Sequence, residues 1–218
     1  KANRWIEFQK FAENTLKYAQ QDLHQMFHQT VNIPLATVMT GKPVMIVARG
    51  QHYKKDLQML RPFIERAKPI LIGVDGGANA LLESDLYPDL IIGDMDSVSA
   101  TALRSGAELV VHAYPDRSAP GMRRLEELGL SGHVFPMFGT SEDAALMLAY
   151  EKEAEKIILI GSHSHMIDFF EKGRKGMGST WLVRMWVGDR LIDAKGFHHL
   201  YHGCQTFPTI QASTTTVI

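Results

Sequence analysis

Residues 70–79 read Ile-Leu-Ile-Gly-Val-Asp-Gly-Gly-Ala-Asn, an apolar run that passes directly into an acid and two glycines. A run without polar alternation is typical of a strand buried on both faces, and so of a parallel sheet with helices on each side. Five further short runs lie at Val44–Ala48, Leu90–Ile92, Glu108–Val111, His133–Pro136 and Ile157–Ile160. Amphipathic segments separate the runs, at Asp56–Arg66, Asn79–Ser84, Ala100–Ser105, Met122–Leu128 and Glu142–Glu151. This alternation predicts an α/β domain over residues 43–196, with a doubly wound, mostly parallel sheet of about six strands.

The segments on either side of this domain have a different pattern. Residues 1–42 are expected to form a long N-terminal amphipathic helix and a linker, because apolar side chains recur at steps of three and four from residue 3 to about residue 30. That helix either packs on its own domain, or pairs with a second copy or an upstream domain. A basic, glycine-rich stretch after Gly161 leads to an expected helix at Trp181–Val187 and a short strand at Leu191–Asp193. Residues 197–218 are expected to form a loose tail.

Composition excludes several classes of protein. Of the 218 residues, 45% are hydrophobic and 22% are charged, which argues against a disordered chain. Lys and Arg (23) nearly balance Asp and Glu (24), so no global positive field draws the chain to nucleic acid or anionic lipid. No apolar run approaches the ~20 residues of a membrane-spanning helix, and a single cysteine, Cys204, suits a reducing compartment. We therefore expect a cytoplasmic protein, associated with a membrane only through a longer parent chain.

Polar residues follow the apolar runs at the strand ends, where ligands bind in a doubly wound sheet. Asp75 follows one run, and Asp94 and Asp96 follow the next. Alternate residues of an extended chain point to the same side, so Asp94 and Asp96 can aim at one point. Clustered carboxylates repel one another unless a cation joins them, and hard oxygen ligands select Mg²⁺. We predict a metal site at these three aspartates; the alternative is that Asp75 and Asp94 only cap helices or turns.

Backbone amides and hydroxyls at the same edge suit phosphate. Gly76 and Gly77 precede a helix and offer bare N–H groups. Residues 140–143, Thr-Ser-Glu-Asp, have the pattern of a helix N-terminus, which either caps the helix alone or also holds phosphate or ribose. Arg174 and Lys175, flanked by glycines, either clamp a phosphate or form an exposed basic loop. Several histidines lack the spacing of a zinc site and are expected at the surface or behind the ligand-contacting residues: His163, His165, His198, His199 and His202.

The stretches Asp75-Gly-Gly-Ala-Asn79 and Pro88-Asp-Leu-Ile-Ile-Gly-Asp-Met-Asp-Ser97 resemble the catalytic domain of thiamine pyrophosphokinases. Those enzymes carry a similar Asp-Gly-Gly and Gly-Asp-x-Asp-Ser at successive strand ends, and the resemblance runs from about Val44 to Gly161. A closer likeness is to the SteA-like cytokinetic ring proteins of the same superfamily. It rests on Arg49-Gly50, His112-Ala-Tyr-Pro115, Gly139-Thr-Ser-Glu-Asp143, Lys172-Gly-Arg174, Asp193-Ala-Lys-Gly196 and the segment Phe11-Ala-Glu-Asn-Thr-Leu16.

The chain departs from the enzyme pattern at three places. Ser141 stands where the family has Asp, and Asp143 stands where it has Glu. Ser162-His-Ser-His165 replaces an Arg-x-Asp-His stretch. The residues after Gly196 are too few for the β domain that contacts thiamine in those enzymes, so we expect an intact nucleotide half and a missing thiamine half.

The resemblance implies a protein that binds ATP or a similar nucleotide with Mg²⁺ and passes pyrophosphate to an acceptor hydroxyl. Asp75, Asp94 and Asp96 then hold the metal, and Asp75 completes the metal site or takes the acceptor proton. One alternative is a catalytically silent nucleotide-binding scaffold of the cell-division ring, with a division protein as partner, that forms a homodimer through its N-terminal helix or a domain face. Another is a domain that binds some other phosphorylated metabolite. The expected nucleotide-binding residues are Arg49, Gly50, Gly76, Gly77, Ser97, Thr140, Ser141, Glu142, Asp143, Gly161, Arg174 and Lys175.

Overall fold

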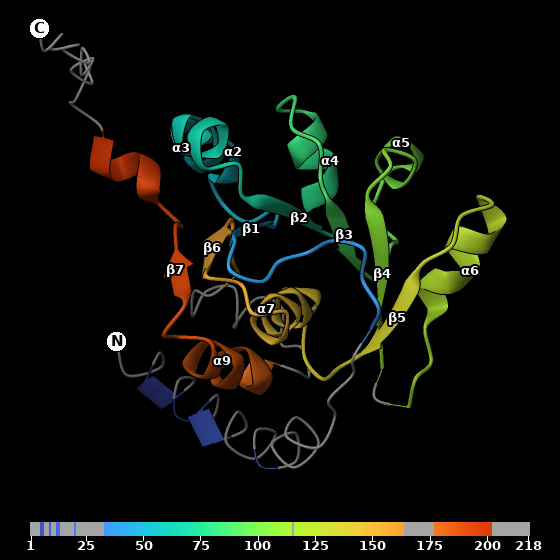
Figure 1. Ribbon diagram of the computed structural model, residues 1–218. Helices are drawn as coiled ribbons and strands as arrows, with labels where there is room; N and C mark the ends of the chain where they lie inside the picture. Colours follow the sequence, from blue (N-terminus) through green and yellow to red (C-terminus); the bar gives the residue numbers. More distant parts are fainter. Residues whose placement is uncertain are drawn as a thin grey trace, which may run out of the picture.

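The computed structural model describes residues 5, 6, 9, 12, 13, 20, 33–114, 116–163 and 177–201. In these residues seven strands form one sheet in the order β5-β4-β3-β2-β1-β6-β7, with every neighbouring pair parallel (Figure 1). The strands are β1 Pro43–Val47, β2 Ile70–Val74, β3 Leu90–Gly93, β4 Glu108–Ala113, β5 His133–Pro136, β6 Lys156–Ile160 and β7 Leu191–Asp193. The predicted doubly wound α/β fold is confirmed, and its sheet has seven strands because Leu191–Asp193 joins β6 as an edge strand.

The helices lie on both faces of the sheet (Figure 1). Five lie on one face: α2 Tyr53–Met59, α3 Arg61–Ala67, α4 Gly77–Leu82, α5 Ala100–Leu103 and α6 Pro120–Glu127. On the other face lie α7 Ser141–Glu151 and α9 Met177–Trp186, and a 3-10 helix, η1 Phe197–Tyr201, follows β7. The single helix expected over Asp56–Arg66 is split at Leu60, since Pro62 lacks the N–H that would continue the α2 hydrogen bonds.

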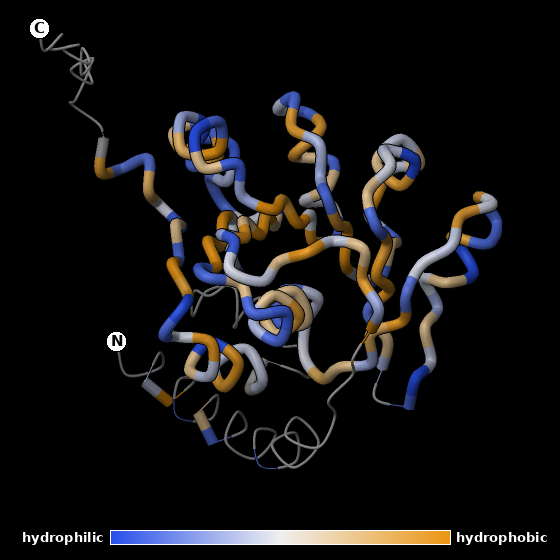
Figure 2. The backbone as a smooth tube through the Cα atoms, viewed as in Figure 1, coloured by the Kyte–Doolittle hydropathy of each residue, from blue (hydrophilic) through white to orange (hydrophobic). Residues whose placement is uncertain are grey.

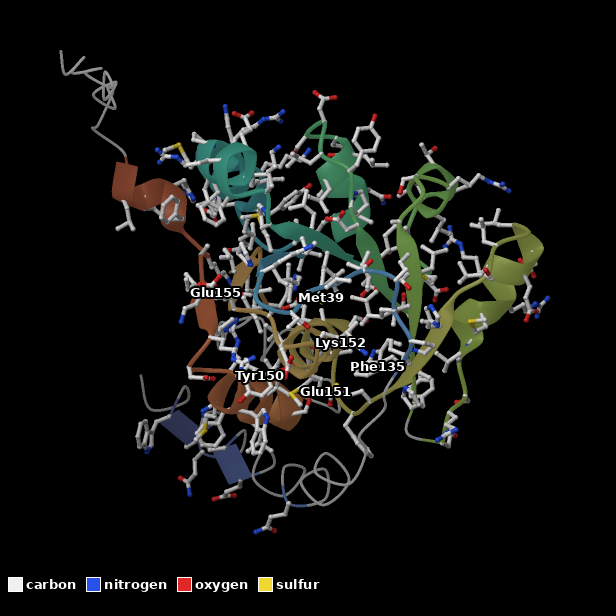
Figure 3. The ribbon with its side chains drawn as sticks, viewed as in Figure 1. Met39, Phe135, Tyr150, Glu151, Lys152 and Glu155 are labelled. Atoms are coloured by element: carbon white, nitrogen blue, oxygen red, sulfur yellow. The ribbon has the colours of Figure 1, made fainter. Side chains whose placement is uncertain are left out.

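Successive residues of the inner strands pack into opposite layers of the core, which explains why the runs lack polar alternation. Val44 and Ile46 belong to the cluster that includes α7 and α9 side chains, whereas Met45 and Val47 pack with side chains of α2, α3 and α4. Figure 2 shows the hydrophobic residues concentrated along these strands. Figure 3 labels Met39, which is buried in the α7 layer and lies in the segment expected to be a linker.

The ends of the chain were predicted as a long helix and a loose tail. The N-terminal helix falls almost entirely outside the described residues and stays a prediction. At the other end, η1 is held by the buried carboxylate of Asp56, which accepts from the backbone N–H of Gly196 and of His198, each at 2.9 Å. His198, expected at the surface or behind the ligand-contacting residues, is only 4% exposed, and its Nδ1 lies 2.6 Å from Asp56. A surface position is therefore wrong for this residue, and no pattern in the sequence indicates its acidic partner, which lies 142 positions earlier in the chain.

Asp143 joins the two helices on the α7 face. Its carboxylate forms a capping box with Thr140 and also accepts from the hydroxyls of Ser179 and Thr180 at the start of α9. All of these bonds reach Oδ2, while the buried Oδ1 has no hydrogen-bond partner among the described residues. Burial raises the pKa of Asp143 to about 6, against the opposing effect of the Thr140 and Thr180 hydrogen bonds.

Because the pKa of Asp143 is higher in the folded protein than its ordinary value of 3.8, the folded state binds this proton more tightly than the unfolded state. The resulting stability is complete below about pH 4 and is lost as the pH rises through about 6, with a total on the order of 3 kcal/mol. We expect urea denaturation to show that the stability difference between wild type and Asp143→Asn falls across this range. Other titrating groups are common to both proteins, so their effects cancel in the difference. If the two plots of unfolding free energy against pH were parallel, the raised pKa of Asp143 would be contradicted.

Among the described residues, no helix combines the length and the apolar character needed to span a membrane.

Candidate active site

The order in which strands are added to the sheet reverses at β1, although all the strands stay parallel. From β1 the strands proceed through β2, β3 and β4 to β5, and the next strand, β6, is placed on the opposite side of β1. The connecting helix α7 lies on the face opposite α2–α6 (Figure 1). In open α/β sheets such a switch point leaves a crevice beyond the carboxyl ends of the two strands, where ligands bind. The residues that follow β1 and β6 therefore flank the expected binding position.

The switch point is built of bare backbone. The N–H of Gly50 donates to the carbonyl of Gly161 at 2.8 Å. A Cβ at Gly50 would overlap that carbonyl oxygen, and a Cβ at Gly161 would overlap the carbonyl oxygen of Ala48. Gly77 lies equally close to the carbonyl of Val47. Because these glycines carry no side chains, β1, β6 and the start of α4 can approach one another closely. We refer to Gly50, Gly77 and Gly161 as the glycine floor.

Arg49 lies at this floor. A Cβ at Gly76 would come within 2.9 Å of the Arg49 Nε and 3.0 Å of its Cζ, so the guanidinium rests against the glycine backbone. The structure thus brings together Arg49, Gly50, Gly76, Gly77 and Gly161, which were predicted separately from different strand ends.

Asp75 and Asp94 form a close pair at the ends of β2 and β3. Asp75 has a left-handed backbone (φ 48°), and its Oδ1 accepts from the Asp94 N–H at 2.9 Å. Gly93, with φ 152°, is required beneath this contact because a Cβ there would overlap the Asp75 carboxylate. The pair is consequently fixed by backbone geometry.

The electrostatics of the pair favour a bound cation. Burial and the neighbouring charge of Asp94 raise the pKa of Asp75 to about 7, while hydrogen bonds from the Ser141 hydroxyl and the Asp94 backbone oppose the rise. Two carboxylates that resist simultaneous ionisation are stabilised by a proton or a metal ion between them.

Asp94 and Asp96 are both exposed, and the intervening Met95 is fully buried. The Oδ1 of Asp94 accepts from the Asp96 N–H at 3.0 Å. No group of three or more histidine, cysteine, aspartate or glutamate side chains in the described part of the chain is arranged to hold a metal ion. Mg²⁺ commonly binds one or two carboxylates and completes its shell with water and substrate phosphate. The pair Asp75–Asp94 fits that role, and the predicted participation of Asp96 stays a prediction.

The first turn of α7 lies beside the residues that follow β2 and β6. The Ser141 hydroxyl lies near enough to Asp75 to lower the pKa of that carboxyl, and Glu142 hydrogen-bonds to His163, just after β6. Thr140 serves as the N-cap, and Asp143 points inward and is fully buried. Of the four residues predicted to hold phosphate or ribose, the structure places the Ser141 and Glu142 side chains beside other polar groups of the crevice.

Two residues that sequence reasoning missed hold the acidic turn in place. Arg124, on α6, donates to the carbonyls of Met95, Asp96 and Val98, each at 2.6 Å. Asn79, on α4, donates to the carbonyl of Ser97 and accepts from the N–H of Ser99, both at 2.9 Å. Asn79 stands in the quoted glycine motif, but nothing in the sequence distinguishes Arg124 from its solvated neighbour Arg123. Ser97 is exposed, whereas Arg174 and Lys175 lie outside the described residues.

Part of the chain matches a known family. Residues 63–118 match the family described as thiamin pyrophosphokinase, catalytic domain. This span contains β2, β3 and β4 together with all three predicted metal-binding aspartates. The resemblance to the thiamine pyrophosphokinase catalytic-domain superfamily is thereby confirmed, and the SteA-like branch stays a prediction.

Two archaeal relatives share another description. The 6-hydroxymethyl-7,8-dihydropterin pyrophosphokinase of Methanocaldococcus jannaschii is 30% identical over 149 residues, covering 58% of this chain and 61% of that protein. The protein of the same description from Methanothermobacter thermautotrophicus is 35% identical over 106 residues, covering 42% of this chain and 45% of that protein. The chain therefore spans roughly half to three fifths of the length of these relatives. Among solved structures, thiamine pyrophosphokinase from Bacillus subtilis aligns with a TM-score of 0.39 at 23% identity, over 69% of this chain and 60% of that one.

Arg124→Met keeps the aliphatic stem and removes the three hydrogen bonds that hold residues 95–98. We expect a loss of about 2–3 kcal/mol in the free energy of unfolding, at about 1 kcal/mol for each bond, measured by urea denaturation. The matched control is Arg123→Met, because the contact that Arg123 makes among the described residues is an exposed ion pair with Glu127, which is worth less than about 0.5 kcal/mol. Equal stability of the two variants would contradict the role assigned to Arg124.

Proposed function

We propose that this chain, with its match to the thiamin pyrophosphokinase catalytic domain, is a pyrophosphokinase that binds ATP or a similar nucleotide with Mg²⁺ and transfers pyrophosphate to an acceptor hydroxyl. The observation that carries the proposal is the Asp75–Asp94 pair, fixed at the strand ends beside a glycine floor at the topological switch point. The descriptions of the two archaeal relatives support the same reaction class.

The residues at the switch point would bind the phosphates in different ways, some through a metal ion and some directly. Asp75 and Asp94 would hold Mg²⁺, which when bound would partly neutralise the negative charge of the phosphates. Arg49 offers a guanidinium, a planar group of N–H donors that matches phosphate oxygens. Gly76 and the first turn of α7 offer backbone N–H groups, which favour anions at a helix N-terminus. Together these groups bind and orient a polyphosphate along the sheet edge.

Two acceptor classes are suggested by the matches. Thiamine and 6-hydroxymethyl-7,8-dihydropterin both carry a primary alcohol that can attack a phosphorus atom. No contact among the described residues favours one acceptor over the other. We therefore propose the shared chemistry, transfer to a primary alcohol, and use both compounds as probes.

A second candidate function is the nucleotide-binding scaffold of a cytoplasmic cell-division assembly. It is favoured by exposed apolar side chains on α9, where Trp181 is 53% exposed, Met185 66% and Trp186 48%. Such a protein would bind nucleotide at the same edge, form a homodimer and catalyse no transfer.

Titration calorimetry distinguishes a phosphate site at the strand ends from one elsewhere. Wild type should bind ATP in the presence of Mg²⁺, and Asp94→Asn should weaken that binding at least about tenfold, equivalent to about 1.4 kcal/mol. Asp85→Asn is the matched control, since Asp85 is exposed in the turn after α4 and already has a left-handed backbone that asparagine accepts. Unchanged affinity in Asp94→Asn would place the nucleotide outside this edge.

Product analysis then separates the two candidate functions. With ATP, Mg²⁺ and either probe alcohol, a pyrophosphokinase releases AMP in equal amount to the pyrophosphorylated alcohol. Release of ADP would indicate single-phosphate transfer. Binding without any AMP would contradict the enzyme and favour the scaffold.

A further inference from the structure

His163 and Glu142 form a second polar pair at the switch point, separate from the aspartates. The backbone N–H of His163 donates to Glu142 Oε2 at 3.1 Å, and the imidazole Nδ1 lies 2.5 Å from Glu142 Oε1. The His163 side chain is 31% exposed and that of Glu142 is 15% exposed. One carboxylate therefore fixes both the position of residue 163 and the orientation of its ring.

This contact determines which nitrogen can act as a base. A carboxylate oxygen accepts hydrogen bonds, so the proton of a neutral imidazole is held on Nδ1 and the lone pair is left on Nε2. A histidine oriented by a carboxylate in this way is the usual arrangement of a general base. The partial exposure of His163 leaves the ring accessible to a ligand in the crevice.

The His163–Glu142 pair lies at the same sheet edge as the aspartates, at a distance that a polyphosphate can span. His163 follows β6 and Asp75 follows β2, and the two strands are separated by β1 alone. Adjacent strands lie about 4.8 Å apart, so the two ends are about 10 Å apart, with the glycine floor between them. Consecutive residues of α7 reach both groups, because Ser141 contacts Asp75 and Glu142 contacts His163. A polyphosphate held at the aspartates would thus extend toward His163.

We propose that His163 is the general base for the acceptor hydroxyl and that Glu142 is its positioning residue. The inference rests on the proposed pyrophosphokinase function. The Nε2 of His163 takes the hydroxyl proton while the acceptor oxygen forms a bond to the β-phosphorus of ATP. The bond between that phosphorus and the oxygen bridging to the α-phosphorus breaks, and AMP leaves with the electron pair. Asp75 is then free to act with Asp94, and takes no part in deprotonating the acceptor.

The test is steady-state kinetics of AMP release from Mg²⁺ and ATP with thiamine and with 6-hydroxymethyl-7,8-dihydropterin. His163→Gln should lower kcat by at least about 100-fold, the usual contribution of a general base, and leave the KM for ATP within about threefold. Glu142→Gln should lower kcat by a smaller factor, again without raising that KM. His133→Gln is the matched control and should leave kcat unchanged: its ring also meets a glutamate, Glu108, at 3.2 Å, but at the first residue of β5.

A rescue experiment excludes a merely structural role. Imidazole added to His163→Gly should restore part of the lost kcat, whereas it should not restore Asp94→Asn. A kcat for His163→Gln equal to wild type, or a raised KM for ATP at unchanged kcat, overturns the base role and leaves the proposed function intact. If wild type itself forms no AMP with either alcohol, the proposed function fails and the base role fails with it.

Discussion

The hydrogen bond from the Asp94 N–H to the Asp75 carboxylate is the contact on which the candidate site depends. It joins the ends of two neighbouring parallel strands, and it can form only because Gly93 carries no Cβ and Asp75 adopts a left-handed backbone. The folded protein therefore keeps a left-handed backbone at Asp75, which is conformationally unfavourable, and holds two acids close enough to repel each other. Strain and unfavourable charge concentrated at one strand-end position are characteristic of sites that receive a ligand.

The helix α7 is the second constraint, because its first turn lies beside both Asp75 and His163. Ser141 reaches β2, Glu142 reaches the end of β6, and Asp143 turns inward to hold α9. A displacement of this helix would therefore alter the aspartate pair, the histidine pair and the packing of α9 together. Arg124 acts similarly from α6, by fixing three carbonyls of the turn between Asp94 and Ser99. The geometry of the site is thus determined by helix termini docked on both faces of one sheet edge.

The strand-end acids and glycines could be predicted from the sequence because they are local. In a parallel sheet all carboxyl ends meet at one edge, so a polar residue directly after an apolar run has a known location. Partnerships between distant segments could not be predicted in this way. Glu142 and His163 are 21 residues apart, and Asp56 and His198 are 142 apart. Asp143 reads as an ordinary capping residue until the fold places Ser179 and Thr180 against it.

A crystal structure of this chain with Mg²⁺ and α,β-methylene-ATP would test the central claim most directly. The account predicts a metal ion bound by Asp75 and Asp94, with the polyphosphate lying over Gly50, Gly76 and Gly161 toward His163. A nucleotide bound at any other edge or face of the sheet, with the two aspartates free of metal and phosphate, would contradict it.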